Sequence, residues 1–158
     1  MKELVLRWRE VGIIAGVLFA INVAGRFAAK MIKAGNQQTL DDRQALAGFI
    51  TLGAIALVFL AMTLYWGRIR SMWEVGTNLG FAAVIACVLS IFLGPLIVGK
   101  SPFEGGAGNF FSQVWWWGGL AIGGVTLGFI ILISFTADYK SKQLKSFAER
   151  QKAQPKRV

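Results

Sequence analysis

The sequence predicts an all-α integral membrane protein, with four transmembrane helices in an antiparallel bundle and both termini on the cytoplasmic side. Of its 158 residues, 55% are hydrophobic and only 16% are charged, which is more apolar and less charged than the average soluble protein. The run from Gly105 to Ala137 contains no Asp, Glu, Lys or Arg, and three more apolar runs precede it. A bilayer core about 30 Å thick requires roughly 20 residues of apolar helix. Four such spans use nearly the whole chain and leave no room for a separate soluble domain.

The chain is expected to form one transmembrane domain with two short flanking segments. An interfacial lead-in over residues 1–10 is followed by the transmembrane domain over 11–137 and by a basic cytoplasmic helix and tail over 138–158. The spans are expected at about 11–32, 44–66, 75–98 and 114–137.

The first span carries its basic residues at one end. Its uncharged part, residues 11–25, is short for a membrane crossing, so the helix is expected to continue through Arg26 and Lys30. One polar stripe on one helical face results from the spacing of Asn22, Arg26, Lys30 and Lys33. The stripe is either a basic groove for an anionic lipid or ligand, or a set of long side chains that reach outward to the membrane surface.

The second helix is predicted to open at a capping box formed by Thr39 and Asp42, ahead of its apolar span. A short aromatic and basic turn follows this span and makes spans two and three neighbours. The basic residues of this turn and of the following tail are candidate contacts for anionic lipid: Arg68, Arg70, Lys140 and Lys142.

Small residues at intervals of four mark the third span. Such residues let another backbone approach closely, which promotes helix association in lipid. The candidate helix-packing positions in this span are Gly76, Gly80, Ala82, Ala86, Ser90 and Gly94. The stripe can serve packing within the bundle or contact with a helix of another protein.

A loop is expected over residues 99–113, between the third and fourth spans. No strand precedes its glycines, as a phosphate-binding P-loop requires, so nucleotide binding is not expected here. Its aromatic residues and the following tryptophan triplet are candidate contacts with the interface or with a partner: Phe103, Phe110, Phe111, Trp115, Trp116 and Trp117.

The fourth span contains two small-xxx-small pairs on adjacent faces. These candidate helix-packing pairs are Gly119 with Gly123 and Gly124 with Gly128. Glycine lowers helix propensity, so close helix contact is the physical reason to expect glycines here.

The composition argues against most kinds of chemistry. The chain has no histidine and one cysteine, Cys87, so the commonest general base, an axial haem histidine and an intramolecular disulfide are all excluded. No Asp or Glu falls inside the four spans, which disfavours a proton relay. We therefore expect no catalytic residues, no metal, no cofactor and no enzymatic activity. The net charge of +9 is explained by membrane topology and anionic lipid rather than by nucleic-acid binding.

The charge distribution predicts the orientation. With four spans, 12 Lys and Arg lie on the side of the termini and 5 on the other side, which places both termini in the cytoplasm. The expected protein is a non-catalytic accessory or structural subunit of a larger membrane complex, for example a respiratory, lipid-transport or cell-envelope complex, in the bacterial inner membrane. Its expected partners are other integral membrane proteins and, on the cytoplasmic side, anionic lipids. A small oligomeric channel or transporter and a stand-alone anionic-lipid-binding protein are the alternatives.

Overall fold

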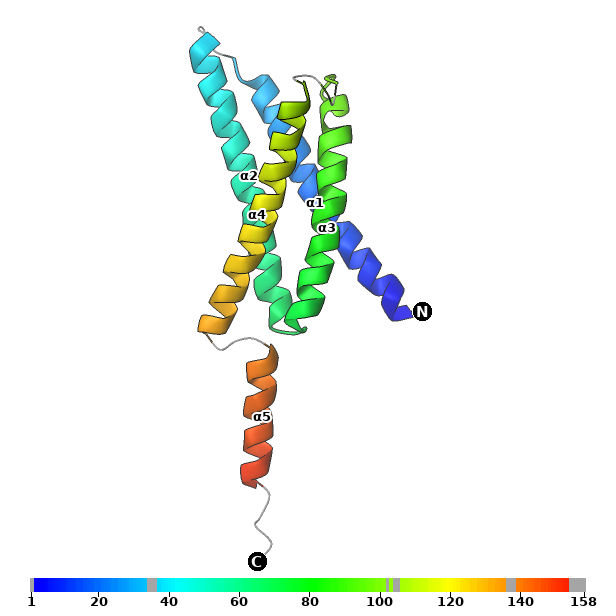
Figure 1. The fold of residues 1–158 in the computed structure, drawn as a ribbon, viewed down its shortest axis with the longest axis vertical. Helices are drawn as coiled ribbons and strands as arrows, with labels where there is room; N and C mark the ends of the chain where they lie inside the picture. Colours follow the sequence, from blue (N-terminus) through cyan, green and yellow to red (C-terminus); the bar gives the residue numbers. More distant parts are fainter. Residues whose placement is uncertain (1, 34–36, 102, 104–105, 136–138, 154–158) are drawn as a thin grey trace, which may run out of the picture.

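A computed structural model describes residues 2–33, 37–101, 103, 106–135 and 139–153. The described residues form five helices and no strand (Figure 1): α1 Lys2–Met31, α2 Gln37–Gly67, α3 Met72–Ile97, α4 Gly106–Ser134 and α5 Tyr139–Ala153. Four of these helices are long and apolar enough to cross a membrane by length and composition. The shortest of the four, α3, has 26 residues, or about 39 Å at 1.5 Å per residue. The ends of the predicted segments at 1, 136–138 and 154–158 lie outside the described residues.

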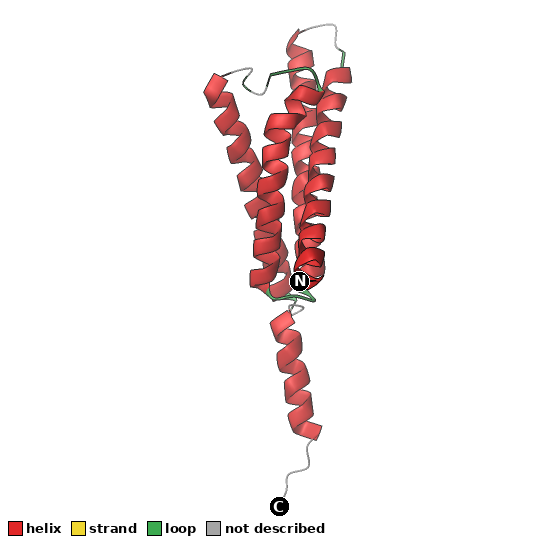
Figure 2. Cartoon of the chain, turned by 90° about the vertical axis from the view of Figure 1, so that its right-hand side faces the viewer, coloured by secondary structure: helices red, strands yellow, loops and turns green. Residues whose placement is uncertain are grey.

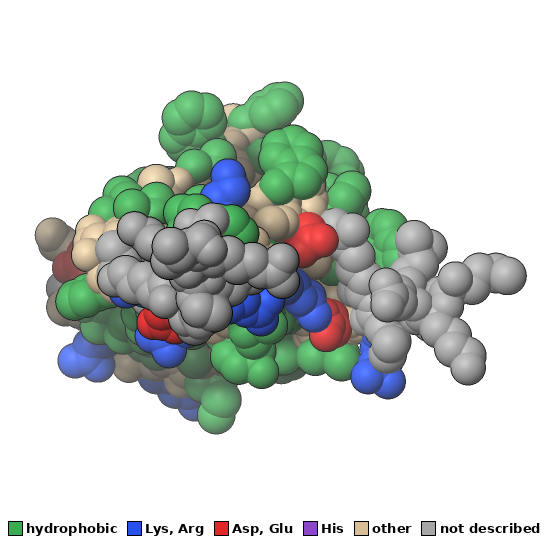
Figure 3. All heavy atoms as spheres, turned by 90° about the horizontal axis from the view of Figure 1, so that it is seen from below, with side chains coloured by type: hydrophobic (Ala, Val, Ile, Leu, Met, Phe, Trp, Pro, Cys, Tyr) green, Lys and Arg blue, Asp and Glu red, His purple; other side chains and the backbone are tan. Residues whose placement is uncertain are grey.

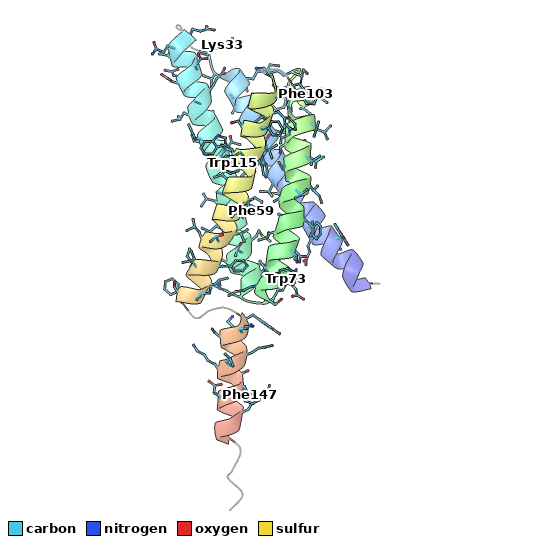
Figure 4. All side chains as sticks on the ribbon, viewed as in Figure 1. Lys33, Phe59, Trp73, Phe103, Trp115 and Phe147 are labelled. Carbon is cyan, nitrogen blue, oxygen red and sulfur yellow. The ribbon has the colours of Figure 1, made fainter. Side chains whose placement is uncertain are left out.

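The four long helices pack as a bundle in which α1 lies against α2 and α3, and α4 lies against α2 and α3. Figures 1 and 2 show α5 beyond one end of this bundle. Lys33 and Phe103 lie at one end of the bundle and Trp73 at the other (Figure 4). Each long helix therefore extends from one end of the bundle to the other.

The core is narrow and apolar. Phe59 of α2, Leu18 of α1 and Leu79 of α3 are fully buried, and Trp117 brings α4 into the same cluster. Most other large apolar side chains are exposed, and Figure 3 shows hydrophobic groups around the outline of the molecule. Such an apolar exterior is stable only where water is excluded, which agrees with four helices suited to lipid.

Two helices begin earlier than the sequence predicts. Helix α2 begins at Gln37, two residues before the predicted capping box, so Thr39 and Asp42 lie inside its first turns and do not open it. Helix α4 begins at Gly106 rather than near residue 114, so Phe110 and Phe111 are helical and not part of a loop. In both places hydropathy marks the segment best suited to lipid, whereas backbone hydrogen bonding continues beyond that segment.

Pro95 and Gly99 determine where α3 ends. Pro95 lies within the last turn, and the N–H groups of Val98 and Lys100 both donate to its carbonyl oxygen, at 3.0 and 2.9 Å. Gly99 has φ +79°, the left-handed conformation in which glycine commonly terminates a helix. The helix ends at Ile97, two residues after Pro95.

Candidate functional site

The polar face of α1 is the starting point of the candidate site. Asn22, Arg26 and Lys30 follow one another at intervals of four, so they share one side of the helix. Lys30 Nζ donates to the carbonyl oxygen of Val98, at 3.0 Å, just after the last residue of α3. A cation here complements the carbonyl-rich end of that helix.

Arg26 joins three helices through its guanidinium group. Its Nε donates to Asn22 Oδ1 at 2.9 Å within α1, and its Nη2 donates to Gln113 Oε1 of α4 at 3.1 Å. The same Nη2 approaches the carbonyl oxygen of Ser90 in α3 to 3.3 Å. Arg26 therefore does not simply extend along α1 to the membrane surface, as the alternative interpretation of the stripe proposed.

Small residues on α3 leave room for the Arg26 side chain to extend between the helices. The α3 positions Ala82, Ala86, Ser90 and Gly94 are all buried. A Cβ atom added to Gly94 would lie 3.0 Å from Arg26 Nε, so any larger residue would press on the guanidinium. Part of the small-residue stripe of α3 thus packs against α1 within this chain.

A cavity of about 240 Å³ lies beside Arg26 and is open to the outside. It is lined by α1, α2 and α4, through Asn22, Gly25, Arg26, Ala29, Gly48, Thr51, Leu52, Gln113, Trp116 and Trp117. It is smaller than the roughly 300 Å³ at which pockets for drug-sized ligands begin. The space therefore suits a small group rather than a nucleotide.

The polar atoms around Arg26 are arranged to leave hydrogen-bond donors. The amide oxygens of Asn22 and Gln113 already accept from the guanidinium, which leaves each amide with its NH₂ group. Arg26 Nη1 donates to no described residue in the hydrogen bonds of this cluster. No Asp or Glu lines the cavity. A positive charge held by neutral acceptors alone is incompletely compensated.

Comparison with known proteins assigns the chain to no family. No protein-family model, curated protein or solved structure matches it. Within the described residues, no group of three or more Cys, Asp or Glu could hold a metal ion. The chemistry of the site is therefore argued from its geometry.

A second arginine lies in a different environment at the other end of the bundle. Arg70, in the turn between α2 and α3, donates through Nη1 and Nη2 to the carboxylate of Glu10, at 2.7 and 3.1 Å. Its guanidinium carbon lies 4.9 Å from the centre of the Trp66 ring. The hydrogen bond to Glu10 raises the pKa of Arg70. Arg70, predicted as a lipid contact, is thus engaged within the chain.

The glycine positions differ in what surrounds them. Gly124 and Gly128 of α4 lie against α2, next to Phe59 and Thr63. Apart from Gly94, which packs against Arg26, the other predicted packing glycines have open space where a Cβ atom would be: Gly76, Gly80, Gly119 and Gly123.

The aromatic candidates fall into two groups. Phe103 and Phe110 stack with ring centroids 5.8 Å apart, and both contact Phe92 of α3, so they bind the end of α3 to the start of α4. Phe111 is exposed and touches Phe110.

The three tryptophans do not share a face. Trp115 is 81% exposed and Trp116 is 52% exposed, whereas Trp117 is only 4% exposed and belongs to the core. Consecutive helical residues point about 100° apart, so three in a row cannot all face a partner. Trp117 is therefore a core residue, which corrects its assignment as a surface contact.

The remaining predicted lipid contacts are exposed side chains: Lys33, Arg68, Lys140 and Lys142. Sequence reasoning missed Gln113, Thr51 and Glu10 as members of the two arginine sites. The only signal for Gln113 was its amide side chain in an uncharged run, directly before Val114 and the tryptophan triplet.

Proposed function

We propose that this protein is a non-catalytic subunit that packs against another integral membrane protein through the outer face of α4. The observation that carries the proposal is an open apolar groove of about 790 Å³ along this face. The groove is lined by Gly108, Phe111, Ser112, Val114, Trp115, Gly118, Gly119 and Ile122.

The shape of the groove favours a transmembrane helix as its occupant. Gly119 and Gly123 are one helical turn apart, and neither has an atom within 4 Å of an added Cβ. Lipid gives no hydrophobic incentive for helices to associate, so close backbone contact over small residues is what promotes association. Exposed Trp115 and Phe111 beside the glycines offer large rigid surfaces of the kind that dominate protein interfaces.

The proposal includes the orientation of the chain. An antiparallel arrangement with both termini in the cytoplasm follows from the excess of Lys and Arg on that side, 12 against 5. We place the protein in the bacterial inner membrane, with α5 and its basic residues next to anionic lipid.

Mild-detergent purification from the native membrane tests the proposal. The wild-type chain is expected to bring down other membrane proteins in a fixed ratio, and the double variant Gly119→Leu/Gly123→Leu is expected to lose them. Gly53→Leu, at an exposed glycine of α2 that also has open space around it, is the control and is expected to retain the partners. Isolation of the wild-type chain as a lone monomer would overturn the proposal. Lipid bound in the groove in place of protein would overturn it equally.

A further inference from the structure

The cavity beside Arg26 combines a positive charge with an excess of hydrogen-bond donors. We infer that it binds a phosphate group, carried either by a lipid headgroup or by a small soluble phosphate. This site is separate from the α4 groove of the proposed subunit contact, because the two are lined by different residues.

The positive charge of Arg26 has no negatively charged partner in the cavity and favours the binding of an anion. The carbonyl and amide oxygens that accept from the guanidinium are neutral, and no carboxylate lines the cavity. A cation inside a membrane protein is costly unless it is paired, and such residues commonly mark ligand sites. The pairing of Arg70 with Glu10 shows that this chain does supply a carboxylate to an arginine elsewhere.

The donors fit an anion with several oxygens. Arg26 Nη1, the Asn22 amide nitrogen and the Gln113 amide nitrogen all belong to residues that line the cavity. A phosphate group presents four oxygens, of which three or four are unesterified in a phosphomonoester or inorganic phosphate and two in a lipid phosphodiester, whereas a carboxylate presents two oxygens in all. The Thr51 hydroxyl also lines the cavity, but it already donates to the carbonyl of Ala47 at 2.8 Å and so is not counted among the available donors.

The position of the cavity suits a group at the membrane surface. Arg26 lies five residues before the end of α1, or about 7 to 8 Å along the helix. Lys30 and exposed Lys33 follow toward that end, where Lys33 is seen in Figure 4. These cations raise the local concentration of anions near the cavity. At about 240 Å³, the cavity accommodates a phosphate and excludes a nucleotide.

Binding to the delipidated, detergent-solubilised full-length protein tests the inference. The probes are phosphatidylglycerol in mixed micelles, inorganic phosphate, acetate and, as a neutral lipid, phosphatidylcholine. Tryptophan fluorescence reports occupancy, because Trp116 and Trp117 line the cavity. Far-UV circular dichroism and the melting temperature show that each variant is folded.

Three variants locate the site. Arg26→Gln removes the charge and is expected to weaken phosphate-group binding roughly tenfold or more. Arg68→Gln makes the same change at an exposed arginine in the turn between α2 and α3 and is expected to bind as wild type. Gly48 lines the cavity and an added Cβ there meets nothing within 4 Å, so Gly48→Leu is expected to occupy part of the cavity and to weaken binding without removing a hydrogen-bond partner of Arg26. This variant keeps the test valid if Arg26→Gln does not fold.

Each outcome decides the inference. Binding of phosphatidylglycerol alone, lost in Arg26→Gln and Gly48→Leu, supports the site and identifies a lipid headgroup as the source. Binding of inorganic phosphate with the same losses supports it and identifies a soluble phosphate. The inference is overturned if neither probe binds, if acetate or phosphatidylcholine binds as tightly, or if Arg68→Gln weakens binding as much as Arg26→Gln. The subunit contact is unaffected by any of these results.

Discussion

Two faces of α4 carry the same small-residue spacing and have different surroundings. Gly124 and Gly128 lie against α2, where an added Cβ at Gly124 would be 2.8 Å from the carbonyl oxygen of Ala56 and 2.9 Å from the Cβ of Phe59. Gly119 and Gly123 face open space. One face is therefore used within the chain, and the other is available to a second protein. The comparison shows that small-residue spacing marks where a helix can pack closely, but does not tell whether that helix belongs to the same chain or to another protein.

The largest effect is expected from a bulky residue on the filled face. Gly124→Leu would force α2 and α4 apart, because the nearest atoms include backbone that cannot rotate away. We expect a loss of about 3 kcal/mol or more in the free energy of unfolding, at or above the upper end for overpacking. Thermal unfolding of the detergent-solubilised protein measures it. The same substitution at the next residue, Gly123→Leu, should leave the melting temperature nearly unchanged; equal losses at both positions would erase the distinction between the faces.

A smaller loss is expected from one added methyl group. In Gly128→Ala, the new Cβ would lie 2.6 Å from the Cβ of Thr63, a fully buried residue whose hydroxyl donates to the carbonyl of Phe59. We expect a destabilisation of about 1 to 3 kcal/mol. Gly118→Ala, with open space around it, is the matched control and should gain slightly from its higher helix propensity. The melting temperatures of the two variants measure the effect. If Gly128→Ala were as stable as wild type, the close packing of Gly128 against Thr63 would be contradicted.

The ion pair between Glu10 and Arg70 is expected to contribute less to stability than the close helix packing at Gly124 and Gly128. Glu10→Gln replaces the carboxylate acceptor of the charged Arg70 guanidinium by a neutral amide oxygen, and both side chains are about one-third exposed. We expect a loss of up to about 1 kcal/mol that diminishes with added salt. Chemical unfolding at low and high salt measures it, with Glu74→Gln as a control for the loss of a nearby negative charge. A loss independent of salt would show that the pair acts through packing.

The smallest effect is expected at Ser90, a buried residue of α3. Its side-chain oxygen is buried and has no hydrogen-bond partner among the described residues. Ser90→Ala keeps the small size and removes this unsatisfied group, so stability should be unchanged or rise by up to about 1 kcal/mol. A clear fall in melting temperature would mean that the hydroxyl has a partner, such as a water molecule.

The sequence predicts the number of long helices because hydropathy reports directly on transfer to lipid. It places the opening of α2 only two residues after its first residue, Gln37, but places the start of α4 near residue 114, although that helix begins at Gly106. It places Asn22 and Arg26 on one face, because residues four apart are neighbours on a helix.

The remaining partners could not be predicted in this way. Gln113 is 87 residues from Arg26, and Glu10 is 60 residues from Arg70. Both contacts depend on how the helices pack, which local spacing does not determine. The same limit explains why Gly119 and Gly124 look alike in the sequence and differ in the fold.

The ion pair between Glu10 and Arg70 has a consequence for synthesis and insertion of the chain. Its two members are separated by the whole of α2, so it can close only after two helices and the turn that follows them have been made. Helix α1 also packs along α3, which is synthesised later still. A nascent chain that ends before residue 72 therefore leaves uncovered the face of α1 that α3 later packs against.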